Sequence, residues 1–445
     1  MRTYKVHPPG LIFILMLCCL GLTRASDPAD EYFALGYKYF QNRQFDKAID
    51  AYTKAIDHRP TFTKAYYNRG VAELNLTLYA VAASDFNNVL QEDPSHLKAL
   101  LYRGFCNMKL QKNEQALDDF QGVLRADPIN SDALFNRGIL HMKAKRFELA
   151  IADFDQTILV KPAHSAVFFN RGFCHGAKGQ DDLALMDYNA QIRNNANHKT
   201  VYTNKGNTEV RLELYQQAIG SYNKAISFNP ASFEAYQGRA FAYLSLGQHA
   251  QAIEDFSMAI RMDGKMVNNY KNRAMAYVEM KQLGPALKDL DIFLQEFPGD
   301  FEALLKKGEI LNVLEKFEQA KSILSRAIKT NGRDGRAYTL RGYAYQRMGQ
   351  KEKAIQDFDE VLKRGDDFHA YFNRGNLFFQ KGDFKRAIVD FNSAIDLDSS
   401  YGNAYYMRAK SKLNLEDTNA GCADLRKAKS LGVEKAKELM ALYCR

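Results

Sequence analysis

Small residues recur along this chain with a period of 34 residues. Glycine or alanine opens each unit, at Gly36, Gly70, Gly104, Gly138, Gly172, Gly206, Ala240, Ala274, Gly308, Gly342, Gly375 and Ala409. The one exception to the period is the step of 33 residues from Gly342 to Gly375. A second small residue follows twelve residues later, and an aromatic residue or leucine sixteen residues later. A fixed period of this length predicts a stack of similar units, which we number repeats 1 to 12.

Each unit is expected to form two helices, because the small residues let two backbones approach closely and the aromatic ring fills the gap between them. Six units also place a proline 24 residues after the opening position, at Pro60, Pro94, Pro128, Pro162, Pro230 and Pro298. This pattern resembles the tetratricopeptide repeat over residues 29 to about 431. The resemblance implies an all-α fold, a right-handed superhelical solenoid of about 12 helix-turn-helix repeats with a C-terminal capping helix.

The ends of the chain predict a three-part organisation. Residues 1–25 are expected to be a signal peptide, residues 26–431 the solenoid and residues 432–445 the capping helix. Arg2 and Lys5 precede an apolar run over residues 11–22, and Ala25 offers a small residue for cleavage. That run is too short to span a bilayer as an ordinary helix. We therefore expect export to the periplasm or to a secreted or lumenal compartment, with an uncleaved membrane anchor as the alternative.

The cysteines outside the leader divide into two groups. Cys106 and Cys174 lie two repeats apart, too far for a bridge, and are expected to be buried free thiols. The stretch from residue 421 to Cys444 resembles the closing segment of many exported bacterial tetratricopeptide repeat proteins. In an oxidising compartment Cys422 and Cys444 would form a disulfide, and the alternative of two unpaired, packed thiols stays open.

Comparison of the repeats with one another predicts an ion pair inside most of them. Nine repeats carry arginine directly before the opening position, and the same nine carry aspartate sixteen residues after that arginine. Arg137 with Asp153 and Arg171 with Asp187 are two of these pairs. Arginine suits bidentate pairing with a carboxylate, so we expect structural ion pairs between the two helices of a repeat. Repeats 1, 6 and 9 lack the pair and are expected to be weak points.

The resemblance also implies that the first helix of each repeat lines a concave groove, where the residue two before the opening position faces a ligand. Asparagine occupies that position six times, at Asn68, Asn136, Asn170, Asn204, Asn272 and Asn373. Its amide both donates and accepts, as an extended peptide backbone requires. Phe135, Phe169 and Phe173 are expected to add apolar anchors beside the groove. The alternative is that these residues only fill the repeat and pack between helices.

The sequence shows no constellation for catalysis. The histidines are dispersed, and there is no paired-cysteine metal pattern, phosphate loop or nucleophile motif. We therefore expect a protein that is not an enzyme and has no cofactor or metal. The formal net charge of +9 falls to +6 without Arg2, Lys5 and Arg24 of the expected signal peptide. The sequence shows no basic pattern typical of a nucleic-acid-binding surface.

The predicted function is a protein-protein interaction scaffold that binds extended polypeptide segments in its groove. Its partners are then other proteins, with membrane association only through those partners or an uncleaved signal. Two alternatives remain. The chain would be a structural or assembly component of an envelope or secretion complex, or a subunit that presents substrates to a separate enzyme.

Overall fold

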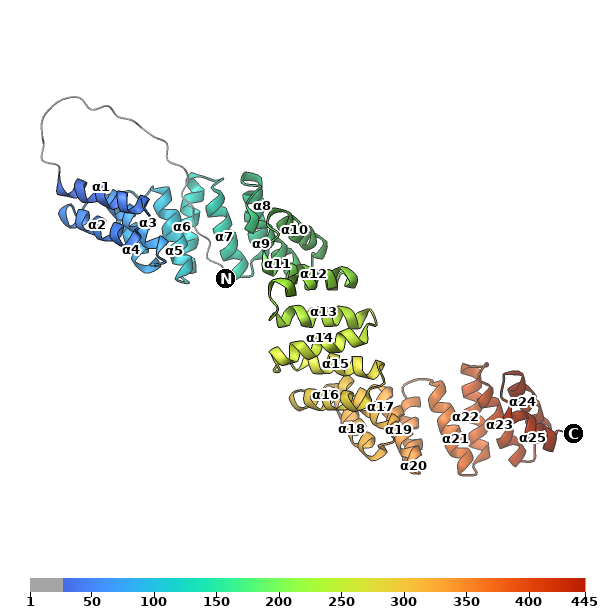
Figure 1. Ribbon diagram of the computed structural model, residues 1–445. Helices are drawn as coiled ribbons and strands as arrows, with labels where there is room; N and C mark the ends of the chain where they lie inside the picture. Colours follow the sequence, from blue (N-terminus) through green and yellow to red (C-terminus); the bar gives the residue numbers. More distant parts are fainter. Residues whose placement is uncertain (1–26, 445) are drawn as a thin grey trace. The chain divides into compact units, whose positions relative to one another are not determined.

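The computed structural model describes residues 27–444. The expected signal peptide lies outside the described residues. In the described part, the chain forms 25 α-helices and no β-strand, so the fold is all-α (Figure 1). The helices follow one another as antiparallel pairs, as the period predicts, and a further helix follows the twelfth pair.

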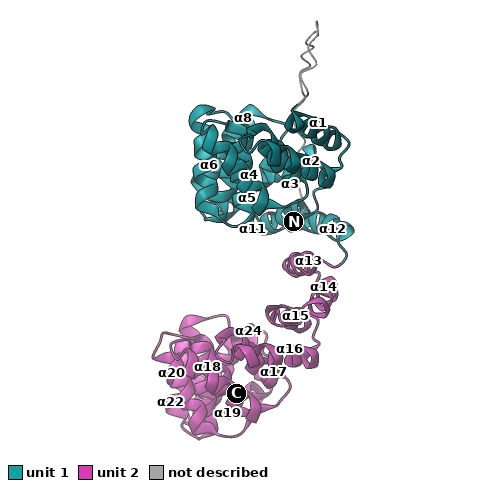
Figure 2. Ribbon diagram, turned by 90° about the vertical axis from the view of Figure 1, so that its left-hand side faces the viewer, with its two compact units in different colours: residues 1–230 teal, residues 231–445 magenta. Residues whose placement is uncertain are grey.

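The chain divides into two compact units, residues 1–230 and 231–445 (Figure 2). Unit 1 contains α1 (Pro28–Gln41), α2 (Phe45–His58), α3 (Thr63–Asn75), α4 (Tyr79–Glu92), α5 (Leu97–Lys109), α6 (Asn113–Ala126), α7 (Ser131–Lys143), α8 (Phe147–Val160), α9 (Ser165–Ala177), α10 (Asp181–Asn194), α11 (Lys199–Arg211) and α12 (Tyr215–Phe228). Unit 2 contains α13 (Phe233–Ser245), α14 (His249–Met262), α15 (Asn268–Glu279), α16 (Leu283–Glu296), α17 (Phe301–Val313), α18 (Phe317–Thr330), α19 (Gly335–Arg347), α20 (Lys351–Leu362), α21 (Phe368–Gln380), α22 (Phe384–Leu397), α23 (Gly402–Asn414), α24 (Thr418–Ser430) and α25 (Lys435–Tyr443).

The opening glycine of a repeat lets its two helices cross closely. A Cβ atom built on Gly138 would lie 2.7 Å from the ring of Phe154, and one on Gly206 would lie 2.7 Å from the ring of Tyr222. Both rings are almost completely buried. The aromatic ring of the second helix therefore rests directly on the backbone of the first helix, which explains why glycine and an aromatic residue recur together.

The turn between the two helices of a repeat has the same backbone in each repeat. One residue adopts a left-handed conformation there, for example Gln111 with φ 61° and Gly179 with φ 73°. The next residue closes the turn, because the Lys112 N–H donates to the carbonyl of Asn107 at 2.9 Å. This hydrogen bond satisfies a carbonyl that the helix end leaves without a partner.

The core consists of small clusters that join neighbouring repeats. Phe154 and Ala150 of repeat 4 pack with Val167 and Cys174 of repeat 5, and all four side chains are buried. Each repeat thus buries its apolar face against the next repeat, as expected for a stack in which one helix pair alone lacks a sufficient core.

Candidate functional site

The first helices of successive repeats form an unbroken row in unit 1. Each of α1, α3, α5, α7 and α9 contacts the next first helix, as far as α11. Among the described residues, successive second helices make no contact of comparable extent. A layer whose helices touch on one side and spread on the other curves towards the touching side. The first helices therefore line the concave side of unit 1, which we call the unit 1 groove.

The row of first helices is less regular in unit 2. α13 contacts α15, α17 contacts α19, and α21 contacts α23. In the described residues, α15 and α17 make no comparable contact, and neither do α19 and α21. Asn272 lies on α15, beside one of these interruptions.

Four of the asparagines lie on first helices of unit 1. Asn136, Asn170 and Asn204 occupy the same position on α7, α9 and α11, and each is partly exposed. Asn68 lies on α3 and is separated from the other three by Tyr102 on α5. The Asn170 amide nitrogen donates to the carbonyl of Ala166 at 2.8 Å, which fixes its orientation and leaves its oxygen available. Three consecutive helices therefore present an amide at equivalent places.

The phenylalanines divide between packing and exposure. The ring of Phe135 lies 5.9 Å from that of Phe154 and 4.4 Å from that of His164. Phe169 contacts Tyr188 and His198 in the same way. Both phenylalanines therefore pack between repeats, which is the alternative left open for them. Phe173 is 44% exposed, because it lies one residue after the opening glycine and points away from the second helix.

The arginine and aspartate of each predicted pair lie in contact. Arg137 donates to both carboxylate oxygens of Asp153, at 2.9 and 2.6 Å, and Arg171 does the same to Asp187. Equivalent contacts join Arg69–Asp85, Arg103–Asp119, Arg239–Asp255, Arg273–Asp289, Arg341–Asp357, Arg374–Asp390 and Arg408–Asp424. A hydrogen bond with Asp357 raises the pKa of Arg341, so this guanidinium stays charged at neutral pH.

Sequence reasoning missed a further contact of these arginines. The Nη1 of Arg171 donates to Asp155 in the preceding repeat at 2.6 Å. Arginines at six other repeats make the same kind of bond, in the pairs Arg69–Thr53, Arg103–Asn87, Arg273–Ser257, Arg341–Ser325, Arg374–Asp359 and Arg408–Asn392. The available signal was a polar residue 16 positions before each arginine, or 15 before Arg374, whose repeat begins after the missing residue.

Two of the repeats without the arginine and aspartate contain other ion pairs. In repeat 6, Lys205 lies 3.1 Å from Glu209, and the Ser221 hydroxyl donates to the same carboxylate at 2.6 Å. Glu209 is only 1% exposed. The buried carboxylate of repeat 6 therefore belongs to the first helix, whereas in the nine repeats with the arginine it belongs to the second helix. In repeat 9, Lys307 pairs with Asp291 of the preceding repeat. In these two repeats another ion pair therefore stands in place of the arginine–aspartate pair.

Models of the tetratricopeptide repeat match this chain at residues 29–62, 107–166, 200–232, 221–254 and 339–401. These matches fall on the helix pairs described above and lie in both units. The chain belongs to the tetratricopeptide repeat family.

Solved structures with similar repeats share little sequence identity with this tetratricopeptide repeat protein. The anaphase-promoting complex hetero-tetramer Cut9-Hcn1 has 13% identity and a TM-score of 0.40 over 95% of this chain and 97% of its own. YrrB, described as a TPR protein with an unusual peptide-binding site, has 21% identity and a TM-score of 0.39 over 41% and 95%. MamA has 21% identity and a TM-score of 0.36 over 38% and 92%. Because the identities are 21% or less and the TM-scores are 0.40 or less, none of the three structures indicates what this chain binds. A search of curated protein sequences gives no match.

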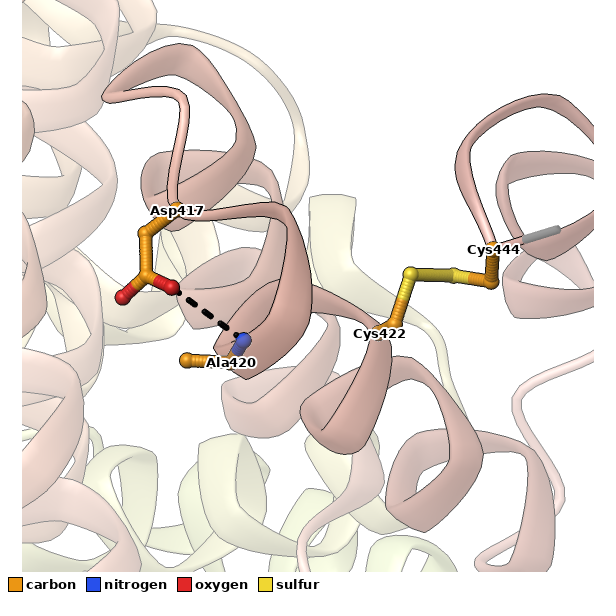
Figure 3. Close-up of a disulfide and its surroundings, with 4 residues drawn as sticks. All are labelled: Asp417, Ala420, Cys422 and Cys444. Carbon is orange, nitrogen blue, oxygen red and sulfur yellow. Dashed lines mark hydrogen bonds between the residues drawn. A yellow bond between two sulfur atoms is a disulfide. The ribbon is translucent and has the colours of Figure 1, made fainter.

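The last repeat of this tetratricopeptide repeat protein is closed by a disulfide. Cys422 on α24 is bonded to Cys444, which follows α25, and their Cα atoms lie 5.6 Å apart (Figure 3). Asp417 caps α24 in the same region by accepting from the Ala420 N–H at 3.2 Å. Leu439 and Met440 of α25 pack against the core of the last repeats. α25 thus covers an apolar surface that the end of a stack would leave exposed.

The other two cysteines in residues 27–444 are buried thiols of low reactivity. Cys106 and Cys174 are free and fully buried, and burial raises the pKa of each thiol to about 12. In residues 27–444, no three or more His, Cys, Asp or Glu side chains are grouped so that they would hold a metal ion. No helix in the same part of the chain is both long and apolar enough to cross a bilayer.

Proposed function

We propose that this tetratricopeptide repeat protein is a non-catalytic scaffold that binds extended polypeptide segments in the unit 1 groove. The observation that supports this most directly is the unbroken row of first helices, three of which present Asn136, Asn170 and Asn204 at equivalent positions. An asparagine side chain has one acceptor oxygen and two donor hydrogens. Asn170 uses one of these hydrogens within its own helix, and its oxygen and second hydrogen complement the N–H and carbonyl of a backbone in extended conformation.

The spacing of the helices suits such a ligand. Packed helices lie about 8 to 10 Å apart, and an extended chain advances about 3.3 Å per residue. One repeat therefore corresponds to about three residues of bound peptide. The amides would contact the backbone at every third residue and would hold a segment without reading each side chain.

The test is a triple substitution of Asn136, Asn170 and Asn204 by alanine. We expect it to abolish binding of an unfolded polypeptide probe, such as reduced and carboxymethylated lactalbumin, and to leave the helical circular dichroism spectrum unchanged. The matched control replaces Asn88, Asn113 and Asn189, which lie on the second helices α4, α6 and α10. Equal binding by the triple variant and the wild type would contradict this proposal and favour a role as an assembly component with an empty groove.

We also propose that the protein is exported. The apolar run at residues 11–22 and the Cys422–Cys444 bridge both support an oxidising compartment outside the cytoplasm. N-terminal sequencing of the mature protein from cell fractions tests this, and we expect a start at Ser26. An intact Met1 in the cytoplasmic fraction would contradict export.

A further inference from the structure

We propose that the unit 1 groove selects segments that combine regularly spaced apolar side chains with acidic residues. This inference rests on the proposed function, and it names the chemistry of the partner. Two features of repeats 1 to 5 support it. One is a row of apolar side chains along the groove, and the other is a set of cations at its rim.

The apolar row lies one residue after the opening glycine of each repeat. It consists of Tyr37, Val71, Phe105, Ile139 and Phe173, all of which are exposed or partly exposed. These residues follow the asparagine position by three, so both rows lie on the same face of each first helix. In unit 2 the equivalent row is interrupted by Glu309, Asn376 and Lys410. A continuous apolar row is therefore a property of repeats 1 to 5, and it ends at Asn207 in repeat 6.

The geometry of the row sets the spacing of the ligand's apolar side chains. Phe105, Ile139 and Phe173 lie on three successive first helices, α5, α7 and α9. With packed helices about 8 to 10 Å apart, an extended ligand places one apolar side chain on each of them at every third residue. A segment of about seven residues spans the three.

The cations gather at the turns that end α5 and α7. Lys109, Lys112, Lys143, Lys145 and Arg146 are all exposed, and we call these five residues the basic rim. Among the described residues, none of the five forms an ion pair with a carboxylate. The nearby Glu148 pairs with Lys178 of the next repeat at 2.9 Å. The rim therefore carries charge that the chain itself leaves uncompensated.

The basic rim and the apolar row belong to one surface. Lys109 and Lys143 follow Phe105 and Ile139 by four residues on the same helices, so each pair shares a helix face. The ammonium of Lys109 lies 5.1 Å from the centre of the Phe105 ring. A ligand that places an apolar side chain on Phe105 would thus bring its neighbouring residue to Lys109. Charge complementarity makes that neighbour aspartate or glutamate.

The turns at the equivalent places in unit 2 have a different charge. Five carboxylates, Glu279, Glu315, Asp383, Glu416 and Asp417, occur there beside the cations Lys281, Lys316, Arg347 and Lys381. Two of these cations, Arg347 and Lys381, pair with Glu315 and Glu352 of neighbouring repeats. An acidic ligand therefore has no comparable rim in unit 2. The same contrast makes unit 2 an internal reference for the proposed selectivity.

The experiment uses the full-length chain and four fluorescent peptides of twelve residues. Three carry leucine at every third position, with aspartate, serine or lysine between the leucines. The fourth alternates aspartate and serine and has no leucine. In 50 mM salt we expect the leucine-aspartate peptide to bind at least tenfold more tightly than the leucine-serine peptide, with the lysine peptide and the leucine-free peptide weakest. The tenfold preference should shrink in 500 mM salt.

A charge-reversed variant tests the rim itself. Lys109→Glu, Lys143→Glu and Lys145→Glu together should remove the preference of the groove for the leucine-aspartate peptide over the leucine-serine peptide. The matched control is Lys47→Glu, Lys54→Glu and Lys224→Glu, on second helices. Equal binding of the aspartate and serine peptides by the wild type would overturn the proposed selectivity, while the groove proposal stands. Tight binding of the leucine-free peptide would overturn it in favour of a general polyanion site. Binding of none of the four would overturn both proposals.

Discussion

At the scale of single residues, seven of the arginines that precede an opening position each connect three helices. Arg171 lies on α9, pairs with Asp187 on α10 and donates to Asp155 on α8. Its side chain is 23% exposed and that of Asp187 is 5% exposed. A guanidinium in this setting cannot be replaced by an ammonium, because three separate directions of donation are used.

A double-mutant cycle on Arg137 and Asp153 measures the strength of one such pair. Each single alanine substitution should lower the free energy of unfolding by about 3 kcal/mol, because it leaves the other charge buried without its partner. The coupling energy should be about 2 kcal/mol. Arg336 and Glu302, whose side chains are 55% and 60% exposed, provide the control pair, with an expected coupling below about 1 kcal/mol. Additive effects at Arg137 and Asp153 would show that the contact contributes nothing.

Glu73 should make the stability of the protein depend on pH. This side chain is 3% exposed, and burial raises its pKa from 4.5 to about 7, with Asp85 raising it further and Arg69 lowering it. The neutral form is favoured in the folded state, so its stabilising contribution is complete below pH 4.5 and is lost as the pH rises through 7. Relative to Glu73→Gln, the wild type should lose about 3 kcal/mol between pH 5 and pH 9.

Urea unfolding at a series of pH values checks this expectation for Glu73. The control is Glu148→Gln, at an exposed carboxylate whose pKa is lowered by Lys178. That group is already ionised at pH 5, so the control difference should stay constant over the range. A constant difference for Glu73→Gln as well would show that its carboxylate is not held in the neutral form.

At the scale of elements, the turn within each repeat imposes a conformation that glycine adopts most easily. Gly179, Gly247, Gly349 and Gly382 occupy this left-handed position in four repeats. Thr77 occupies it in repeat 2 with φ 62°, although a β-branched side chain is strained there. The array therefore keeps one backbone geometry even where the sequence opposes it.

Thr77→Gly should stabilise the protein by about 1 kcal/mol, because it removes the strain of a left-handed threonine. The reverse change, Gly179→Thr, should destabilise it by at least as much. Thermal unfolding of both variants measures the two effects. A loss of stability in Thr77→Gly would mean that the entropy of glycine outweighs the strain at this turn.

Much of the element-level structure follows from the sequence. The 34-residue period predicts the helix pairs, because Gly138 and Phe154 fit together only when two helices cross. The pairing of Arg137 with Asp153 was inferred from their joint occurrence. The packing of Phe135 on His164 was not predicted, because contacts between repeats depend on the angle at which they stack. Glu209 was missed for another reason. It follows Lys205 by four residues on one helix, but the joint occurrence of arginine and aspartate does not include its position.

At the scale of the whole molecule, the chain forms two compact units where the sequence predicts one uniform array. The repeat signature continues through both units, with Tyr222 and Phe256 in equivalent places. The division between Pro230 and Ala231 therefore has no counterpart in the periodic positions. The regular groove and the basic rim lie in unit 1, whereas the disulfide lies in unit 2.

Removal of the disulfide should weaken unit 2 at its end. Cys422→Ser with Cys444→Ser opens a loop of 22 residues, and the chain-entropy model assigns such a loop about 3 kcal/mol. We expect faster hydrogen exchange in α24 and α25, measured by mass spectrometry, with the amides of unit 1 as the internal reference. Unchanged exchange in α25 would show that packing of Leu439 and Met440 is sufficient to hold it.

The bonds of the arginines have a consequence for how such a chain changes its length. Arg171 finds its partners 16 residues before and 16 residues after itself, and Arg341 does the same. Because both partners lie at a fixed separation from the arginine in the sequence, a duplication or deletion of 34 residues supplies each arginine with equivalent neighbours. Gene segments of this size can therefore be copied or lost without leaving an unpaired guanidinium inside the fold. Arrays of different length are then accessible to evolution by single recombination events.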